Sequence, residues 1–285
     1  MTGGIPEGMQ PLQILAKCVA DFPQIRENVN YCSTLGLKYF VPTLKPHNLE
    51  AVLVGSAPSI FNQVSTLKKK RRNPNCVMFG IKGGHDFLLK NKIQPDFGLA
   101  VDPLPKIVKE NFLRDAKNCT YFIASQCDKS LFDGLLEREK NVVIWHLLTH
   151  QLLAWSKEPD SPIKDHYMIP GGSTSGLRGI CLAFGMGFRK FHLFGFDSCL
   201  QGDLRKVNGE MAKNTEEKPN EVIDLHAGGK DFRADKAMAA QAQEFQQLLD
   251  NLSNTDTVKV KAYGEGLIQT LCKERYRSGG RDVFL

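Results

Sequence analysis

Two acidic residues in this sequence come directly after short apolar runs. Asp102 ends the run "FGLAVD", and Asp197 ends the run "FHLFGFD". In an open parallel sheet, ligands bind outside the carboxyl ends of the strands, so acids at these positions are placed to meet a ligand. Mg²⁺ typically takes one or two carboxylates together with phosphate oxygens. We therefore expect Asp102 and Asp197 to act on a substrate or hold a metal ion. Capping of a helix that begins near Pro105 is the alternative for Asp102.

Two turns rich in glycine and hydroxyl residues come before expected helices. Their residues are Gly55, Ser56, Pro58 and Ser59 in the first turn and Gly172, Ser173 and Thr174 in the second. Free backbone N–H groups at the start of a helix bind phosphate or carboxylate. The first turn has neither the Walker spacing nor a GxGxxG pattern, and a tight turn without a ligand is its alternative reading. Together with the two acids, these turns predict an anion-binding site beside carboxylates.

A parallel sheet is needed to bring these residues to one edge. Short apolar runs predict strands over 51–55, 76–81, 97–102, 120–125, 142–148, 191–197 and 258–263. Amphipathic stretches predict helices over 59–70, 85–92, 105–115, 129–140, 174–186 and 234–252. Continuous apolar strands separated by helices are typical of parallel sheets that are covered on both faces. The pattern predicts an α/β fold with a doubly wound, mostly parallel, Rossmann-like sheet.

The chain divides into two parts by pattern. Residues 1–48 predict an N-terminal helical extension, with one or two helices before the proline-broken stretch 41–48. Residues 49–285 predict the Rossmann-like α/β domain. Within it, residues 200–233 are polar and have no clear period, and a segment of this length is typical of a functional loop. We expect this segment to form a mobile lid or flap over the site.

Composition limits the class of protein. The chain has 285 residues, of which 42% are hydrophobic and 24% are charged, as in ordinary globular proteins. No signal sequence and no spanning apolar run is evident, so we expect a cytoplasmic protein without a membrane partner. Eight cysteines without a CxxC pair predict reduced, buried thiols rather than a zinc ribbon. The net charge of +6 includes "KKKRR" at 68–72, which predicts a solvated helix end, with nucleic-acid contact as the alternative.

Three stretches of the chain resemble a known family in their order and spacing. They are "VLVGSAPSI", "IKGGHDFLLKNKIQPDFGLAVDP" and "GGSTSGLRGICLAFGMGFRKFHLFGFDS", and they resemble the 6-hydroxymethylpterin diphosphokinase MptE-like family of bacteria and phages. The resemblance covers roughly residues 50 to 200. Bacterial sialyltransferases and motility accessory factor glycosyltransferases show a more distant similarity. Ala57 stands where the family pattern usually has a second glycine.

The resemblance implies a nucleotide-dependent transferase. The activity for which the family is named moves diphosphate from ATP to a pterin hydroxymethyl group, and the glycosyltransferase relatives move a sugar from a nucleotide. The implied cofactor is Mg²⁺, the implied donor is ATP or a nucleotide-sugar, and the implied acceptor is a small molecule or a glycan. By position, Gly55, Ser56, Pro58, Ser59, Gly172, Ser173 and Thr174 would approach the nucleotide, with Asp102 and Asp197 as the acidic edge.

Charged residues outside the turns complete the implied site. Lys82 or Arg178 would neutralise phosphate charge, and His226 in "DLHAGGKDF" would be the base for glycosyl transfer. A solvated position at a strand end is the alternative for Lys82, and a structural role is the alternative for His226. The contrasting class of protein is a non-catalytic phage or nucleic-acid-associated binding protein. The expected location is the cytoplasm, which is the host cytoplasm if the protein is encoded by a phage.

Overall fold

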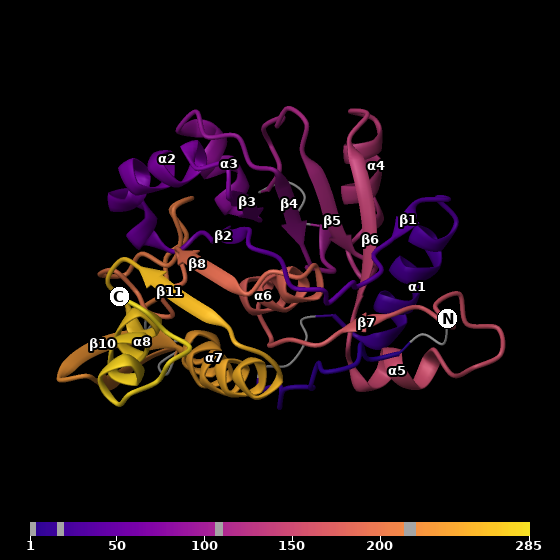
Figure 1. The fold of residues 1–285 in the computed structure, drawn as a ribbon. Coiled ribbons are helices and arrows are strands. Elements are labelled where there is room, and N and C mark those ends of the chain that lie inside the picture. The colour runs from indigo at the N-terminus through magenta and orange to yellow at the C-terminus, as the bar shows by residue number, and fades with distance from the viewer. Residues whose placement is uncertain (1–3, 16–19, 106–110, 214–220) are drawn as a thin grey trace.

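A central parallel sheet organises the molecule (Figure 1). The computed structural model describes residues 4–15, 20–105, 111–213 and 221–285. Every strand pairing in the large sheet is parallel. The sheet runs in the order β1 (Lys38–Tyr39), β6 (Asn141–Leu147), β5 (Thr120–Ala124), β4 (Phe97–Ala100), β3 (Cys76–Ile81), β2 (Glu50–Val54), β8 (Lys190–Phe194) and β11 (Lys259–Tyr263), and β7 (Met168–Ile169) also pairs with β6.

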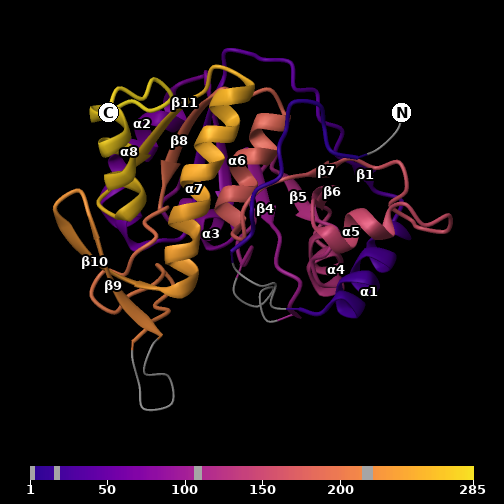
Figure 2. The same cartoon turned by 90° about the horizontal axis from the view of Figure 1, so that it is seen from below.

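Helices cover both faces of this sheet (Figures 1 and 2). One face carries α2 (Val64–Arg72), α3 (Gly83–Lys90) and α4 (Lys129–Leu136), and the other carries α6 (Ser175–Gly185), α7 (Lys236–Thr255) and α8 (Leu267–Arg277). Figure 2 shows α6 and α7 side by side. The remaining helices are α1 (Phe22–Ser33), the short 3₁₀ helix η1 (Pro58–Gln63) and α5 (His150–Trp155). The predicted Rossmann-like α/β class is confirmed.

All seven strands predicted from apolar runs are present. Most are recognisable because they are buried on both faces, so their sequences are apolar without alternation. The edge strand β11 differs, because Lys259 and Lys261 alternate with apolar residues and only Val260 is fully buried. The predicted helices also form, except the one over 105–115. Residues 106–110 lie outside the described part of the chain, and 111–115 are not helical. Four further elements were not predicted from the sequence. They are α5, α8 and the two-residue strands β1 and β7, which are too short to carry a periodic signal.

The N-terminal segment contributes to the sheet itself. Its helix α1 fits the expected helical extension, but β1 pairs in parallel with β6 and the Phe40 N–H donates to the Ile144 carbonyl. The extension predicted over 1–48 is therefore not purely helical, because part of it satisfies the edge of β6.

The segment 200–233 contains a β-hairpin that the sequence analysis did not predict. Strands β9 (Val222–Ala227) and β10 (Lys230–Asp235) pair antiparallel through a two-residue turn. Both turn residues, Gly228 and Gly229, have positive φ, which a tight hairpin turn requires. The Gly228–Gly229 pair is the feature of the sequence from which this hairpin could have been predicted. Residues 214–220 of the expected lid lie outside the described part of the chain.

Three expectations from composition can be compared with the structure. The seven cysteines within the described ranges are free and buried, as predicted, and Cys18 lies outside those ranges. Residues 68–72 form the largely exposed C-terminal end of α2, which confirms the solvated helix end. None of the described helices has the length and apolar character that crossing a membrane requires.

The order of the strands creates a switch point beside β2. From β2 the chain continues to β3, β4, β5 and β6 on one side, and it later returns to place β8 and β11 on the other side. The loops that follow β2 and β8 therefore leave neighbouring strands and diverge over opposite faces of the sheet. Open α/β sheets bind ligands in the crevice that forms at such a point.

Glu50 is the first residue of β2 and lies where the strands begin, at the end of the sheet opposite to their carboxyl ends. Its carboxylate accepts hydrogen bonds from Lys70 (3.1 Å), from His192 (2.8 Å) and from Lys190. Burial opposes ionisation of Glu50, but these three partners outweigh it and lower its pKa from 4.5 to about 2. Because the pKa is lower in the folded protein, the stabilisation is complete above pH 4.5 and is lost as the pH falls from there to about 2.

We expect Glu50→Gln to lower the free energy of unfolding at pH 7 by about 2 kcal/mol, because basic partners lose their carboxylate. The variant should also lose part of the acid sensitivity below pH 4.5. Chemical denaturation across a pH series measures both effects. Glu158→Gln, at an exposed position, is the matched control. Equal stability of Glu50→Gln and the parent at pH 7 would contradict the assignment.

Candidate functional site

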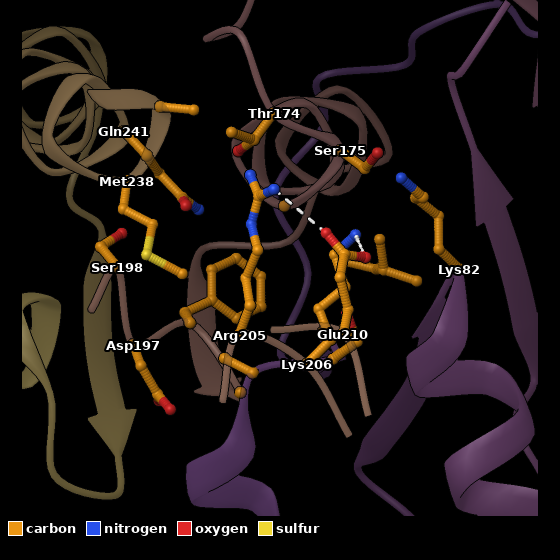
Figure 3. A pocket seen from close by; sticks show the side chains of 18 of the residues that line it. Lys82, Thr174, Ser175, Asp197, Ser198, Arg205, Lys206, Glu210, Met238 and Gln241 are labelled. Carbon is orange, nitrogen blue, oxygen red and sulfur yellow. Dashed lines mark hydrogen bonds and ion pairs between the residues drawn. The ribbon is translucent and has the colours of Figure 1, made fainter. Parts of the chain in front are cut away.

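A cavity of about 740 Å³ lies at the switch point, at the carboxyl edge of the sheet (Figure 3). We call it the switch-point cavity. Its volume is in the usual range for small-molecule sites. Its polar and charged lining consists of Ser56, Lys82, Asp102, Ser173, Thr174, Ser175, Asp197, Ser198, Arg205, Lys206, Asn208, Glu210 and Gln241. The strand ends of β2, β3, β4 and β8, the start of α6 and the start of α7 all contribute to it.

Glycines allow the backbone segments around the cavity to meet closely. A Cβ atom on Gly55 would lie 2.6 Å from the Gly195 carbonyl oxygen, and Gly195 itself has φ of +67°. A Cβ atom on Gly84 would lie 2.1 Å from the Val54 carbonyl oxygen. These contacts hold the loops after β2 and β8 together and press the start of α3 against the end of β2. A side chain at any of these positions would push the walls of the cavity apart.

Lys82 and Asp102 form an ion pair inside the cavity. The Lys82 ammonium lies 2.7 Å from an Asp102 carboxylate oxygen, and the Ser175 hydroxyl lies 3.4 Å from the same oxygen. Figure 3 shows the end of the Lys82 side chain directed toward Ser175. The backbone of Lys82 has φ of 51°, as does that of Ser198 across the cavity. Such strain in residues other than glycine concentrates at functional sites.

The segment after β8 brings further charges over the cavity. The Arg205 guanidinium lies 3.0 Å from Glu210 and 3.0 Å from Asp235, and Lys206 also pairs with Glu210. Burial alone would raise the pKa of Glu210, but the hydrogen bond from Lys206 and the nearby charges hold it below its usual value. The Val207 N–H donates to the Ser56 carbonyl and ties the segment to the loop after β2. Part of the predicted lid therefore lies over the expected edge, and its motion remains a prediction.

The first turn of α6 offers unpaired donors to the cavity. Thr174 caps this helix by accepting a hydrogen bond from the Leu177 N–H, whereas the N–H groups of Ser175 and Gly176 have no partner within the helix. Both residues line the cavity. An anion near these N–H groups is stabilised by the positive end of the helix dipole.

Ser173 does not direct its donors at the cavity. Its N–H and its hydroxyl donate to one oxygen of Glu244, at 2.7 and 2.8 Å, and the other oxygen accepts from the Leu15 N–H. Glu244 is fully buried on α7 and holds the turn before α6 in place. Gly172 lies outside the cavity lining, because its neighbours are Leu177 and Glu244. Gly172 therefore supports the turn and does not face the cavity. Ser173 lines the cavity, but its N–H and hydroxyl are taken by Glu244, and its contact with a ligand stays a prediction.

Asp197 is held by the protein rather than turned toward the centre of the cavity. It is 3% exposed, and its carboxylate accepts hydrogen bonds from the Ser59 N–H (2.9 Å), the Ser59 hydroxyl and the Gln269 amide (3.3 Å). Figure 3 shows its carboxylate pointing away from Arg205. Burial raises the pKa of Asp197, and the hydrogen bonds from Ser59 and Gln269 oppose that rise. In the structure Asp197 caps η1, whose Ser59 lies 138 positions earlier in the chain. Asp197 still lines the cavity, and its expected role toward a ligand or metal stays a prediction.

Pro58 and Ser59 of the first turn lie beneath the cavity. Both are buried, they begin η1, and neither lines the cavity, whereas Gly55, Ser56 and Ala57 do. Within this turn, only Gly55, Ser56 and Ala57 are therefore placed to take the nucleotide-binding role that was expected of it. Ala57, in an ordinary extended conformation with φ of −72°, fits here without strain.

Two other expected site residues lie elsewhere. Arg178 is buried on α6, and its guanidinium donates to the carbonyl oxygens of Leu148 and Ile169, so it joins strand ends instead of meeting phosphate. His226 lies on β9 with its side chain 68% exposed and pairs with Asp231 at 2.8 Å. It does not line the cavity, so the geometry offers no basis for its expected role as a base.

The donor set does not fit a Mg²⁺ ion held by the protein alone. Within the described ranges, no three His, Cys, Asp or Glu side chains gather where they could hold a metal. Asp102 is already paired with Lys82, and Asp197 already accepts three hydrogen bonds from the protein. A Mg²⁺ ion would have to arrive with most of its ligands from phosphate oxygens and water.

Comparison with known proteins identifies the family. The sequence model of the family "6-hydroxymethylpterin diphosphokinase MptE-like" matches residues 24–203, which is more than half of the chain. The chain belongs to this family. The match confirms the resemblance carried by the strand ends and turns. Comparison with curated proteins gives no match for this MptE-like chain.

A solved structure shares the fold of this MptE-like chain. It is the MAf glycosyltransferase from Magnetospirillum magneticum AMB-1, with a TM-score of 0.58 and 15% sequence identity. The alignment covers 90% of this chain and 38% of the neighbour, so the chain spans about two fifths of the length of that protein. At this identity the likeness shows the fold. Both the family and the neighbour carry the names of transferases.

Proposed function

We propose that this chain is a nucleotide-dependent transferase that binds the phosphate groups of its donor in the switch-point cavity. The observation that carries the proposal is the convergence of donors at one edge of the sheet. Lys82, Arg205 and Lys206 line the same cavity as the first turn of α6. Charged side chains and helix N–H groups that are fixed before the reaction stabilise a leaving phosphate without reorganisation.

Glycosyl transfer from a nucleotide-sugar is the reaction that this arrangement favours. The oxygen of an acceptor hydroxyl forms a bond with the anomeric carbon of the sugar, and the bond from that carbon to the phosphate oxygen breaks. The electron pair of the broken bond stays on the phosphate, where Lys82 and the start of α6 stabilise it. Asp102 is the proposed base and takes the proton of the acceptor, because one of its carboxylate oxygens lies outside the ion pair with Lys82. Of the other two carboxylates in the cavity lining, Glu210 is ion-paired through both oxygens and Asp197 is only 3% exposed.

Transfer of diphosphate from ATP is the second candidate, and membership of the MptE-like family favours it. In that reaction the acceptor oxygen bonds to the β-phosphorus and AMP leaves. Catalysis of such a transfer is mostly positioning and charge neutralisation. Mg²⁺ would enter with the nucleotide in this case, because the protein supplies few carboxylate ligands for it.

A panel of nucleotides tests the proposal and separates the two reactions. Thermal shifts are measured with CMP, CTP, UDP and ATP, each with and without MgCl₂. A ligand at 100 times its dissociation constant adds about 2.7 kcal/mol of stability, so binding is readily detected. Stabilisation by CMP or UDP without Mg²⁺ supports glycosyl transfer, and stabilisation only by ATP with Mg²⁺ supports diphosphate transfer. No shift with any nucleotide would overturn the proposal.

A further inference from the structure

A second cavity, of about 410 Å³, adjoins the switch-point cavity. We call it the side cavity. It lies between η1, α3 and the segments 111–114 and 206–208. The two cavities share Ser56, Lys82, Lys206 and Asn208 in their linings. A compound in the side cavity therefore meets the same residues that face a donor in the switch-point cavity.

The walls of the side cavity are apolar and partly open to solvent. Phe61 is 50% exposed and Leu113 is 64% exposed, although both are large hydrophobic residues. Phe61 packs edge-to-face against Phe87, with ring centroids 5.9 Å apart, and Phe87 also lines the cavity. Exposed apolar residues that stand alone need no explanation, but several on one concavity mark a binding site. Aromatic walls of this kind suit a flat ring.

The rim of the side cavity is positively charged. Lys90 and Arg114 line it, and within the described ranges no acid lies at ion-pair distance from either side chain. Lys82 and Lys206, in contrast, are paired with Asp102 and Glu210. The one acid in the lining, Asp86, accepts a hydrogen bond from the Arg114 backbone N–H at 2.9 Å and so fixes the segment that carries this arginine.

We propose that the side cavity binds the acceptor, and that the acceptor has an apolar ring and an anionic group. The ring packs between Phe61, Phe87 and Leu113, and Lys90 and Arg114 attract the anion. A neutral nucleobase would leave both cations without a partner, so the donor's own base is the less suitable occupant. That this compound is the acceptor rests on the proposed transferase function. That the side cavity binds a compound with an apolar ring and an anionic group does not.

Two probes that share a ring test the binding site. The full-length chain is titrated calorimetrically with 1-naphthoate and with neutral 1-naphthalenemethanol. We expect the naphthoate to bind about tenfold more tightly, because only it pairs with the rim cations. Phe61→Ser and Leu113→Ser should each weaken both probes several-fold, while the double change Lys90→Gln and Arg114→Gln should weaken only the naphthoate. Both apolar positions are exposed, so these variants should keep the parent melting temperature.

Control measurements separate this site from the nucleotide site. Lys157→Gln with Arg277→Gln, which removes two exposed cations elsewhere, should bind naphthoate as the parent does. Naphthoate should also bind in the presence of a saturating nucleotide. Displacement of naphthoate by the nucleotide, or parent-like binding by Phe61→Ser, would overturn the proposal, as would no binding of either probe. If naphthoate binds as expected and no nucleotide binds, the site stands and the proposed transferase function fails.

Discussion

Replacing Lys82 with glutamine is expected to lower turnover about 100-fold, as removal of one preorganised donor does in other enzymes. Lys82 carries the ammonium group that lies between Asp102 and the first turn of α6. Without this ammonium, the negative charge that develops on the leaving phosphate is no longer stabilised by a positive charge inside the partly buried cavity. Glutamine keeps most of the side-chain length, so the apolar stem still packs. The measurement is kcat and KM with whichever nucleotide donor stabilises the chain.

The conservative variant and a remote variant make this prediction specific. Lys82→Arg keeps the charge and should keep most of the nucleotide affinity, although its planar guanidinium differs in shape from an ammonium. Lys157→Gln removes an exposed lysine outside both cavities and should leave turnover unchanged. Parent-like turnover in Lys82→Gln would show that Lys82 only stabilises the strand end. Melting temperatures of all three variants exclude misfolding as the cause.

Replacing Asp197 with alanine is expected to lower the free energy of unfolding by about 3 kcal/mol, because buried donors lose their acceptor. The donors are the N–H and hydroxyl of Ser59 and the amide of Gln269. For a domain of this size, such a loss corresponds to a fall of roughly 6–12 °C in melting temperature. Asp197→Asn should lower the free energy of unfolding by less, because the amide oxygen keeps one acceptor. Some stability is still lost, because the new NH₂ group faces hydrogen-bond donors. Chemical denaturation and thermal melting measure these changes.

An exposed acid provides the comparison for Asp197. Asp231 pairs with His226 on the β9–β10 hairpin, and both side chains are mostly solvated, so Asp231→Ala should change stability by less than about 0.5 kcal/mol. Nucleotide binding by Asp197→Asn, measured below its melting transition, should be close to that of the parent. Lost nucleotide binding with unchanged stability would instead make Asp197 a ligand-binding residue.

Local sequence signals were sufficient for seven strands of the large sheet and for the edge where the cavity forms. Runs such as 76–81 and 120–124 are apolar at consecutive positions, because parallel strands are buried on both faces. Topology then places the residues after those runs at one edge, whatever the details of packing. For this reason Gly55, Ser56, Lys82 and Asp102 were assigned to the site from the sequence, and all four line the cavity.

Short elements and non-local partners were beyond such signals. β1 and β7 have two residues each, so their conformation follows from pairing with β6 and not from a pattern of their own. Arg205, Lys206 and Glu210 lie in a polar stretch without period, and only the path of the chain over the sheet edge places them at the cavity. The Gly-Gly turn between β9 and β10 was visible in the sequence and was overlooked.

The sequence by itself determined the parallel α/β sheet and the edge at which glycines, a lysine and an acid gather. Only the tertiary structure decided which polar groups at that edge remain available to a ligand. Asp197 and Arg178 resemble site residues in the sequence, but Ser59 and two backbone carbonyls occupy their hydrogen-bonding groups. The physical reason is that a buried polar group must find partners, and those partners come from segments far away in the chain.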